Sequence, residues 1–351
     1  MTRTLERFQN GLETVPADVA WYLSDLGKSL GKQQLFAAQA PQKLKALKEH
    51  ALVESAVSSN RIEGIEVNDR RVGTLVFGRA ATTNRDEEEV RGYRLALDWI
   101  HSDASNIECD EDNIRRLHSI ARGDIWDSGQ FKEKDGDIVE RYPNGETRIR
   151  FKTVLAQDTP ACMRSLFDLW SRCIREKWVA EIVAMAAYNL DFLCIHPFRD
   201  GNGRVSRLLL LLQSYRLGYE VGRYISLERI IEQNKDRYYE TLERSSVGWH
   251  DGKHDPWPYI RYVFFILKEA YRELEERLGA IGEPKGAKTS AVLSVIGREQ
   301  GTFSVAKLRE QCPGVSLDMI RRVLKDLQAV GRVECLGRGP ASRWRKTDRF
   351  D

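Results

Sequence analysis

A short polar segment between two apolar stretches limits the folds open to this chain more than any other feature. Residues 196–207 read HPFRDGNGRVSR, with an apolar stretch from Ala180 to Ile195 before them and another from Leu208 to Leu212 after them. Apolar stretches of this kind indicate buried helices. A buried junction between two helices gains no stability from a histidine, a carboxylate and several arginines. The segment therefore predicts a functional site set between buried helices.

Most of the remaining chain has helical periodicity. In residues 42–62 the apolar side chains recur largely at helical spacing, and Gly64 stands where a C-terminal cap is expected. The first forty residues predict one or two short helices and a break at Pro16. Further helices are expected over residues 42–62, 87–100, 112–121, 160–178, 180–195, 202–217, 228–246 and 257–278.

One part of the chain has strand character instead. Two β-rich runs between Gly129 and Phe151 flank Pro143-Asn144-Gly145, which predicts a β-hairpin. A two-stranded ribbon is marginal alone, so it must pack on a neighbouring element. Its edge offers main-chain groups to an extended segment of a partner. The expected fold class is mainly α, with this one hairpin before the C-terminal part.

The C-terminal part differs from the rest in charge and in pattern. Residues 284–351 carry a net charge of +7, which leaves −4 for the rest of a chain whose total is +3. A linker-like segment, GEPKGAK, precedes three helical and two strand patterns: residues 289–299, 305–312, 317–330, 332–336 and 342–344. This order is typical of a winged helix-turn-helix domain, which makes DNA an expected partner.

The basic residues of that domain support the same interpretation. Its third helix carries Arg321, Arg322 and Lys325, which would face the major groove. Arg338 and Arg343 would line the wing. The alternative is a small fold that serves only dimerisation or protein contacts.

Bulk properties limit the number of domains and the compartment. A length of 351 residues predicts two or three domains. No run of eighteen apolar residues occurs, so no membrane span and no membrane partner are expected. The N-terminal residues lack the apolar core of a secretory signal, and the six cysteines form no CxxC pair. These features predict a cytoplasmic protein with reduced thiols.

The end of the polar segment predicts an anion-binding site. Gly201, Asn202 and Gly203 stand at the expected start of a helix, where backbone N–H groups can turn toward one point. Arg204 and Arg207 are three residues apart and so project near the same end. Two guanidinium groups over such a nest suit a polyphosphate better than a single carboxylate.

The other polar residues of the segment add the remaining chemistry. Asp200, directly before the nest, is placed to hold Mg²⁺ that bridges phosphate oxygens. His196, followed by the rigid Pro197, would face the same pocket as a general base or acid. The segment contains neither a Walker loop nor a kinase glycine-rich loop.

A carboxylate far from this segment needs a partner. Glu63 lies at the C-terminal end of the helix expected at 42–62 and, at a spacing of four residues, would share a helix face with Ser59. A carboxylate at a helix C-terminus is electrostatically ill placed, so it would gain from a cation elsewhere in the fold. The alternative is an ordinary solvated side chain.

The segment HPFRDGNGRVSR resembles the Fic (Fido) motif, HPFx[DE]GNGRxxR, at every defining position. Ser59 to Gly64 is similar to the inhibitory motif of the family, [ST]xxxE[GN], and residues 129–151 stand in the place of its target-docking flap. The resemblance covers roughly residues 50–280. It implies an all-helical Fic core with a hairpin flap and leaves the C-terminal part outside. Together with the pattern of that part, it divides the chain into three: a helical region at 1–110 with an inhibitory helix at about 42–64, a catalytic core at 111–281, and the winged helix-turn-helix at 284–351.

The resemblance also implies an activity, because most Fic enzymes transfer AMP from ATP to a hydroxyl group of a protein. His196 would be the base that deprotonates a Ser, Thr or Tyr hydroxyl, and Asp200 would hold Mg²⁺. Arg204 would steady the leaving pyrophosphate, and Arg207 would grip the γ-phosphate unless Glu63, hydrogen-bonded to Ser59, occupies it. The residues implied in ATP binding are Gly201, Asn202, Gly203, Arg204, Val205, Ser206 and Arg207, with Tyr238 and Tyr239 in the adenine pocket.

Other functions stay open at this point. The chain could be a DNA-binding regulator whose Fic core senses a nucleotide. The enzyme could instead transfer UMP, phosphocholine or phosphate, or remove AMP, because the motif specifies a phosphate site rather than the group beyond it. Fic proteins often dimerise, so a homodimer is a further expectation.

Overall fold

The computed structural model describes residues 3–39, 41–78, 82–123, 125–141, 145–279, 287–299, 301–312, 315–337 and 342–347. The chain separates into two compact units, Met1–Leu278 and Gly279–Asp351, and each is described by itself. Most of the linker expected at residues 282–288 lies outside the described ranges. No helix in those ranges is both long and apolar enough to cross a membrane.

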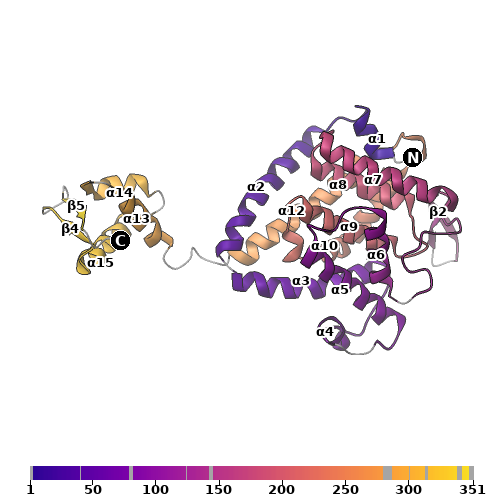
Figure 1. Cartoon of the computed structure of the whole chain (residues 1–351), viewed down its shortest axis with the longest axis horizontal. Coiled ribbons are helices and arrows are strands. Elements are labelled where there is room, and N and C mark those ends of the chain that lie inside the picture. Colours follow the sequence, from indigo (N-terminus) through magenta and orange to yellow (C-terminus); the bar gives the residue numbers. More distant parts are fainter. Residues whose placement is uncertain are drawn as a thin grey trace. The chain divides into compact units, whose positions relative to one another are not determined.

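The first unit is mainly α, as the sequence predicts (Figure 1). Most helices begin and end within a few residues of the expected bounds, because amphipathic periodicity and caps mark them locally. Its longer helices are α2 (Ala17–Gln39), α3 (Pro41–Ile62), α5 (Arg85–Asp103), α6 (Glu111–Arg122), α7 (Thr159–Glu176), α8 (Glu181–Ile195), α9 (Asn202–Arg216), α11 (Lys235–Ser246) and α12 (Trp257–Gly279).

The core of this unit is built around α8. Every residue from Ile182 to Ile195 in this helix is buried. The helix packs against α7 and α9, and the short α1 (Arg3–Gln9) lies against it as well (Figure 1). A helix that is apolar on all sides must be surrounded by other elements. The polar segment therefore connects the buried helix α8 to the equally buried start of α9.

Three features of this unit differ from the expectations. The second helix, α2, is long rather than short. Three ion pairs join its exposed surface to α12: Asp18–Arg261, Asp25–Lys268 and Lys32–Glu275. The helix expected at 228–246 is two helices, α10 (Leu227–Gln233) and α11, because Asn234 leaves helical geometry and binds the Ile230 carbonyl through its side chain. The sequence analysis also missed the short α4 (Asp69–Phe77).

The hairpin forms where the sequence predicts it. Strands β1 (Ile138–Arg141) and β2 (Thr147–Phe151) pair antiparallel, while the expected turn residues Pro143 and Asn144 lie outside the described residues. The ribbon packs on α11, where Glu243 accepts hydrogen bonds from Arg148 and Arg150 of β2. These contacts anchor the ribbon beside the polar segment.

The second unit has a small core of its own. Its elements are α13 (Ala287–Arg298), β3 (Phe303–Ser304), α14 (Val305–Gln311), α15 (Leu317–Ala329), β4 (Val333–Cys335) and β5 (Arg343–Lys346). The three strands form one antiparallel sheet in the order β3-β5-β4. The sequence analysis missed β3, which has two residues, and Arg338 lies outside the described residues.

Candidate active site

The polar segment forms a tight loop between α8 and α9. Two hydrogen bonds fix its shape, because the Asn202 amide binds both the N–H (2.9 Å) and the carbonyl (2.7 Å) of Phe198. The Phe198 ring is fully buried and stacks on His118 with ring centroids 3.8 Å apart. Gly201, at φ 80°, makes the left-handed turn that starts α9. Asn202 thus closes the loop with its side chain, and only its backbone N–H remains for a phosphate.

His196 is held in one orientation. Its Nδ1 lies 3.3 Å from the Leu193 carbonyl, which can only accept a hydrogen bond. Nδ1 therefore carries the proton, and the lone pair is on Nε2. Burial, with the nearby Lys132 ammonium as a second cause, lowers the pKa of His196 to about 4. The imidazole is accordingly neutral at pH 7 and can accept a proton.

The start of α9, where the sequence predicts an anion site, has the backbone N–H groups of a helix N-terminus. The first N–H groups of a helix have no partner within the helix, and those of Asn202, Gly203 and Arg204 stand at this end. The Glu63 carboxylate lies against it, because a Cβ at Gly203 would overlap Glu63 Oε1. Only glycine allows an anion to approach this closely.

Arg207 is enclosed by the end of α3. Its side chain is 1% exposed, and its Nη2 lies 2.7 Å from Glu63 Oε1. Its Nε donates to the Ser59 hydroxyl (2.8 Å), and Nη2 also donates to the Ser59 carbonyl (2.9 Å). Burial acts to lower the pKa of Arg207, but the Glu63 carboxylate together with Tyr238 and Tyr93 outweighs it, and the net shift is upward.

The partner of Ser59 corrects one expectation. The sequence analysis expected the Ser59 hydroxyl to bind Glu63, yet this hydroxyl accepts a hydrogen bond from Arg207. A guanidinium has five donors in a rigid fork, so one Arg207 engages both residues of the helix end.

A second buried contact seats α3 one turn earlier. The Ser55 hydroxyl donates to Glu228 Oε2 (2.6 Å), and the Tyr93 hydroxyl donates to Glu228 Oε1 (2.9 Å). All four polar groups of this helix face are buried: Ser55, Ser58, Ser59 and Asn60. The helix that precedes Glu63 is therefore fixed by small polar side chains as well as by its buried apolar residues, Leu44, Ala51, Ala56 and Ile62.

A cluster of charges that the sequence analysis missed surrounds Asp200. Glu89, a buried residue of α5, accepts from Arg122 Nη1 (2.6 Å) and from Arg204 Nη1 (2.7 Å). Arg122 Nη1 also lies 3.0 Å from Asp200 Oδ2, and Arg85 Nη2 lies 3.3 Å from it. The only local signal was the four-residue spacing of Arg85 and Glu89, which resembles an ordinary surface pair.

This cluster sets the charge of Asp200 and the place of Arg204. Burial acts to raise the pKa of Asp200, but Arg122 and Arg204 outweigh it and the net shift is downward. The Asp200 side chain is 53% exposed and ionised, whereas that of Arg204 is 2% exposed. Arg204 is thus held beneath the site by Glu89.

A cavity of about 420 Å³ opens beside His196 and the start of α9. This volume is within the ordinary range for a small-molecule site. Its wall joins the hairpin, α8, α11 and the Glu63 carboxylate. The lining residues include Glu63, Ile138, Arg150, Phe151, Leu193, His196, Gly203, Tyr238, Tyr239 and Glu243. The structure thus brings together residues that lie more than 170 positions apart in the sequence.

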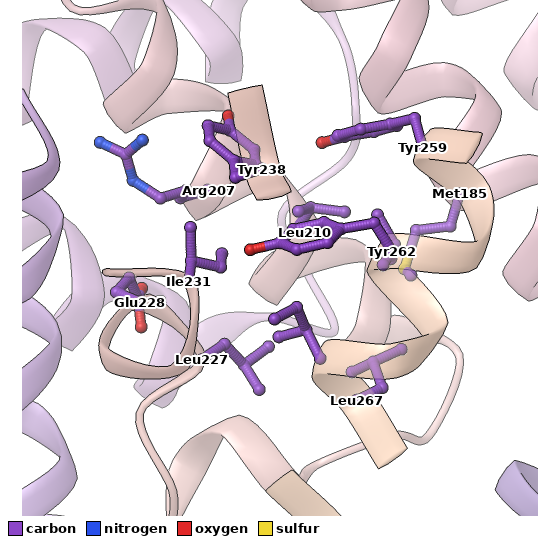
Figure 2. A pocket seen from close by; sticks show the side chains of 12 residues that line it. Met185, Arg207, Leu210, Leu227, Glu228, Ile231, Tyr238, Tyr259, Tyr262 and Leu267 are labelled. Carbon is purple, nitrogen blue, oxygen red and sulfur yellow. The ribbon is translucent and has the colours of Figure 1, made fainter. Parts of the chain in front are cut away.

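The two tyrosines expected in the adenine pocket have different surroundings. Tyr239 lines this cavity, and its hydroxyl lies 3.4 Å from the Ile62 carbonyl. Tyr238 is 3% exposed and also lines a second cavity of only about 20 Å³. Figure 2 shows the Tyr238 ring beside the Arg207 side chain, with Tyr262 and Leu210 in the wall of that small cavity. Tyr238 therefore supports Arg207 as well as facing the larger cavity.

Two residues expected to bind ATP face the interior instead. The Val205 side chain is fully buried. The Ser206 hydroxyl donates to Asn189 Oδ1 (3.0 Å), and the Asn189 amide donates to the Ser206 carbonyl (2.8 Å). These side chains join α9 to α8 because they lie on the helix face opposite the nest. Neither side chain therefore faces the nest, and a part for these two residues in ATP binding stays a prediction.

Comparison with known proteins agrees with this geometry. Residues 108–214 match the model of the Fic/DOC family, a range that contains the whole polar segment. The chain is 26% identical to the protein adenylyltransferase Fic of Drosophila erecta over 279 residues, and 24% identical to that of Drosophila melanogaster over 277 residues. These alignments cover 71% of the chain and about half of each relative, 51% and 52%.

Solved structures share the fold. A Fic family protein from Desulfovibrio desulfuricans G20 matches with a TM-score of 0.63 at 21% identity, over 96% of this chain and 98% of that one. A Fic domain containing signaling protein from Bacteroides thetaiotaomicron matches with a TM-score of 0.61 at 23% identity, over 73% of this chain and 97% of that one. At these identities the likeness concerns the fold alone.

Proposed function

Because the chain is a Fic domain protein, we propose that it transfers AMP from ATP to a Ser, Thr or Tyr hydroxyl of a protein and that Glu63 holds it inactive. The observation that carries the proposal is the position of Glu63, whose carboxylate lies on the anion site of α9 and on Arg207. An anion site occupied by an acidic side chain of the same chain fits a phosphate site with built-in inhibition. The curated relatives named above are protein adenylyltransferases, which supports the choice of AMP.

His196 supplies the base for this reaction. The Nε2 lone pair takes the proton from the target hydroxyl, whose oxygen attacks the α-phosphorus while the bond to pyrophosphate breaks. The Leu193 carbonyl keeps the other ring proton on Nδ1, so the acceptor atom is defined. Since the pKa of His196 is lowered to about 4, the base is already unprotonated at neutral pH.

The start of α9 holds the phosphates. Its backbone N–H groups and the positive helix end favour negative charge that develops on phosphate oxygens. Arg207 Nη1 is buried and has no hydrogen-bond partner among the described residues, so it is available to an additional anion. A γ-phosphate at Arg207 would take the place of the Glu63 carboxylate.

Asp200 fits the Mg²⁺ that such a reaction needs. Mg²⁺ is commonly bound through one or two carboxylates together with substrate phosphates. Asp200 offers an ionised carboxylate, with its side chain 53% exposed, at the end of the loop before the nest. When bound there, the ion would neutralise charge on the phosphates of ATP.

Removal of Glu63 tests the proposal. The Glu63→Gly variant, incubated with ATP and Mg²⁺, should gain the mass of one or more AMP groups on itself or on an added protein extract. The double variant Glu63→Gly/His196→Ala should gain none while it still binds ATP. If Glu63→Gly transfers no AMP, the adenylyltransferase proposal is wrong.

The same incubation separates the alternative donors. Parallel reactions with UTP or CDP-choline would give the masses of UMP or phosphocholine, and ATP itself could give phosphate. Loss of AMP from a previously modified protein would indicate the reverse reaction. Each outcome assigns a different group to the same phosphate site.

The second unit supports a further candidate role, binding to DNA. Arg321, Arg322 and Lys325 are exposed on α15, opposite the buried face of that helix. The order of α13, α14 and α15 followed by the strands β4 and β5 supports this role, because three helices followed by a strand pair is the order on which the winged helix-turn-helix prediction rests. The full chain should bind duplex DNA with an affinity that falls steeply with salt, and an R321A/R322A variant should bind more weakly. Equal binding by both proteins would exclude this role for α15.

A further inference from the structure

Lys132 holds the backbone on both sides of His196. Its backbone N–H donates to the Pro197 carbonyl (2.8 Å), and its ammonium donates to the Ile195 carbonyl (3.2 Å). The ammonium also donates to the Thr153 hydroxyl (2.8 Å). Lys132 is 7% exposed, and among the described residues no carboxylate lies at hydrogen-bond distance from its ammonium, which is unusual for a buried lysine. A buried ammonium placed on the carbonyl directly before His196 calls for a function.

His196 needs such support because its backbone is strained. It caps α8 with φ 53° and ψ 61°, in the left-handed region, which is uncommon for residues other than glycine although histidine, like asparagine, is enriched there. A residue in this region costs about 1–3 kcal/mol and persists only where its surroundings fix it. The two bonds from Lys132 fix the peptide groups on either side, and a cation at a helix C-terminus is also favourable there.

The Lys132 charge also acts on the imidazole. Burial is the larger cause of the lowered pKa of His196, and Lys132 is the second. The opposing groups are the Leu193 carbonyl, the Glu63 carboxylate and Asp200. Asp137, at the start of the hairpin, lines the same cavity as His196. Lys132 is therefore the cation that lowers the pKa of His196 against the carboxylates of Glu63 and Asp200.

We propose that Lys132 is a positioning residue that holds His196 in its left-handed conformation, with Nε2 unprotonated and directed into the cavity. The proposal rests on the function proposed above, in which His196 takes a proton from the target hydroxyl. Lys132 itself touches neither the nucleotide nor the hydroxyl in this account. It acts through the Ile195 and Pro197 carbonyls and through its charge.

The test compares three lysine variants in the active Glu63→Gly background. Lys132→Met removes the ammonium and keeps the length of the side chain, whereas Lys132→Arg keeps the charge and the donors. Lys134→Met is the matched control, because Lys134 is exposed and lies two residues away on the same segment. We expect Lys132→Met to lower kcat by about tenfold or more while the KM for ATP changes less than about twofold. Lys132→Arg should recover most of the loss, and Lys134→Met should resemble its parent.

The pH dependence separates positioning from general damage to the fold. Without the ammonium, the imidazole binds a proton more readily, so the acid limb of kcat/KM should move to higher pH by about one unit. A fold that is merely loosened would lower the rate at every pH. An unchanged acid limb together with an unchanged kcat in Lys132→Met would overturn the proposal.

A direct titration makes the result independent of the activity. The NMR signal of the His196 ring, identified by its loss in His196→Ala, should titrate at higher pH in Lys132→Met than in the wild-type chain or in Lys134→Met. If Glu63→Gly transfers no AMP, the proposed function fails, but this titration still decides the claim about Lys132. If Lys132→Met does not fold, Thr153→Val removes one acceptor of the ammonium and should shift the same signal; an unshifted signal would then count against the proposal.

Discussion

The pairing of Glu63 with Arg207 makes a quantitative prediction about nucleotide binding. The carboxylate lies where the structure offers backbone N–H groups and a guanidinium to an anion, so it must leave before a γ-phosphate can enter. We expect Glu63→Gly to bind Mg·ATP more tightly than the wild-type chain. Glu63→Gln should lie between the two, because its amide oxygen keeps the shape and one acceptor but not the charge.

The size of the effect follows from the geometry. A hydrogen bond between charged groups contributes about 1.5–3 kcal/mol when it is shielded from water. Arg207 is 1% exposed, but Glu63 is 32% exposed, so solvent weakens the pair. We therefore expect about 1–2 kcal/mol, which corresponds to a roughly 5–30-fold decrease in Kd for ATP in Glu63→Gly. The Glu63→Gln variant should gain about half of this free energy.

Isothermal titration with Mg·ATP, with every protein in the His196→Ala background, is the appropriate assay, because the loss of the base allows binding to be measured without turnover. Glu66→Gln is the matched control, since Glu66 is exposed and lies three residues further along the chain. Ser59→Ala should have a smaller effect than Glu63→Gly, because Arg207 keeps its bonds to the Ser59 carbonyl and to Glu63. An unchanged Kd in both Glu63 variants would show that the carboxylate does not compete with the nucleotide, and the reasoning on inhibition would be wrong.

Two other predictions concern the same loop. Burial lowers the pKa of His118 from 6.5 to about 4. Between these two pH values the unfolded chain therefore binds more protons than the folded chain. The stability that a neutral His118 contributes is complete above pH 6.5 and should be lost as the pH falls to 4. The free energy of unfolding, measured by urea denaturation at each pH, should fall by up to about 3 kcal/mol over this window. In a His118→Gln variant the free energy of unfolding should change less with pH. Gly203→Ala should destabilise the wild-type chain more than the Glu63→Gly chain, because a Cβ at this position overlaps the Glu63 carboxylate. Equal changes in melting temperature in the two backgrounds would contradict that account.

Local sequence patterns were sufficient for the elements that carry the site. Apolar stretches on both sides of residues 196–207 predict the buried helices α8 and α9, and their bounds agree closely with the structure. The hairpin also follows from a local turn signal and two β-rich runs. The break at Asn234 was missed because helical periodicity continues across it, so the pattern gives no sign of the interruption.

Part of the chemistry of the polar segment could likewise be predicted from the sequence. Glycines at a helix start predict the anion site, and His196 before Pro197 predicts a base at the same loop. Which side chains of the segment reach the cavity was less clear. Val205 and Ser206 follow the nest directly in sequence, but the rotation of α9 turns them to α8. A motif gives the order of residues along the chain, whereas the geometry of the helix decides in which direction each side chain faces.

The sequence by itself thus determined the buried helices, the hairpin and the glycine-rich loop between α8 and α9, because each depends on residues near one another in the chain. The tertiary structure alone decided the partners of these residues. Glu89 of α5 holds Arg204, and Lys132 binds the peptide groups around His196. Ser59 bonds to Arg207 rather than to Glu63. Such contacts depend on which faces of distant elements meet in the folded chain, and no local periodicity records that.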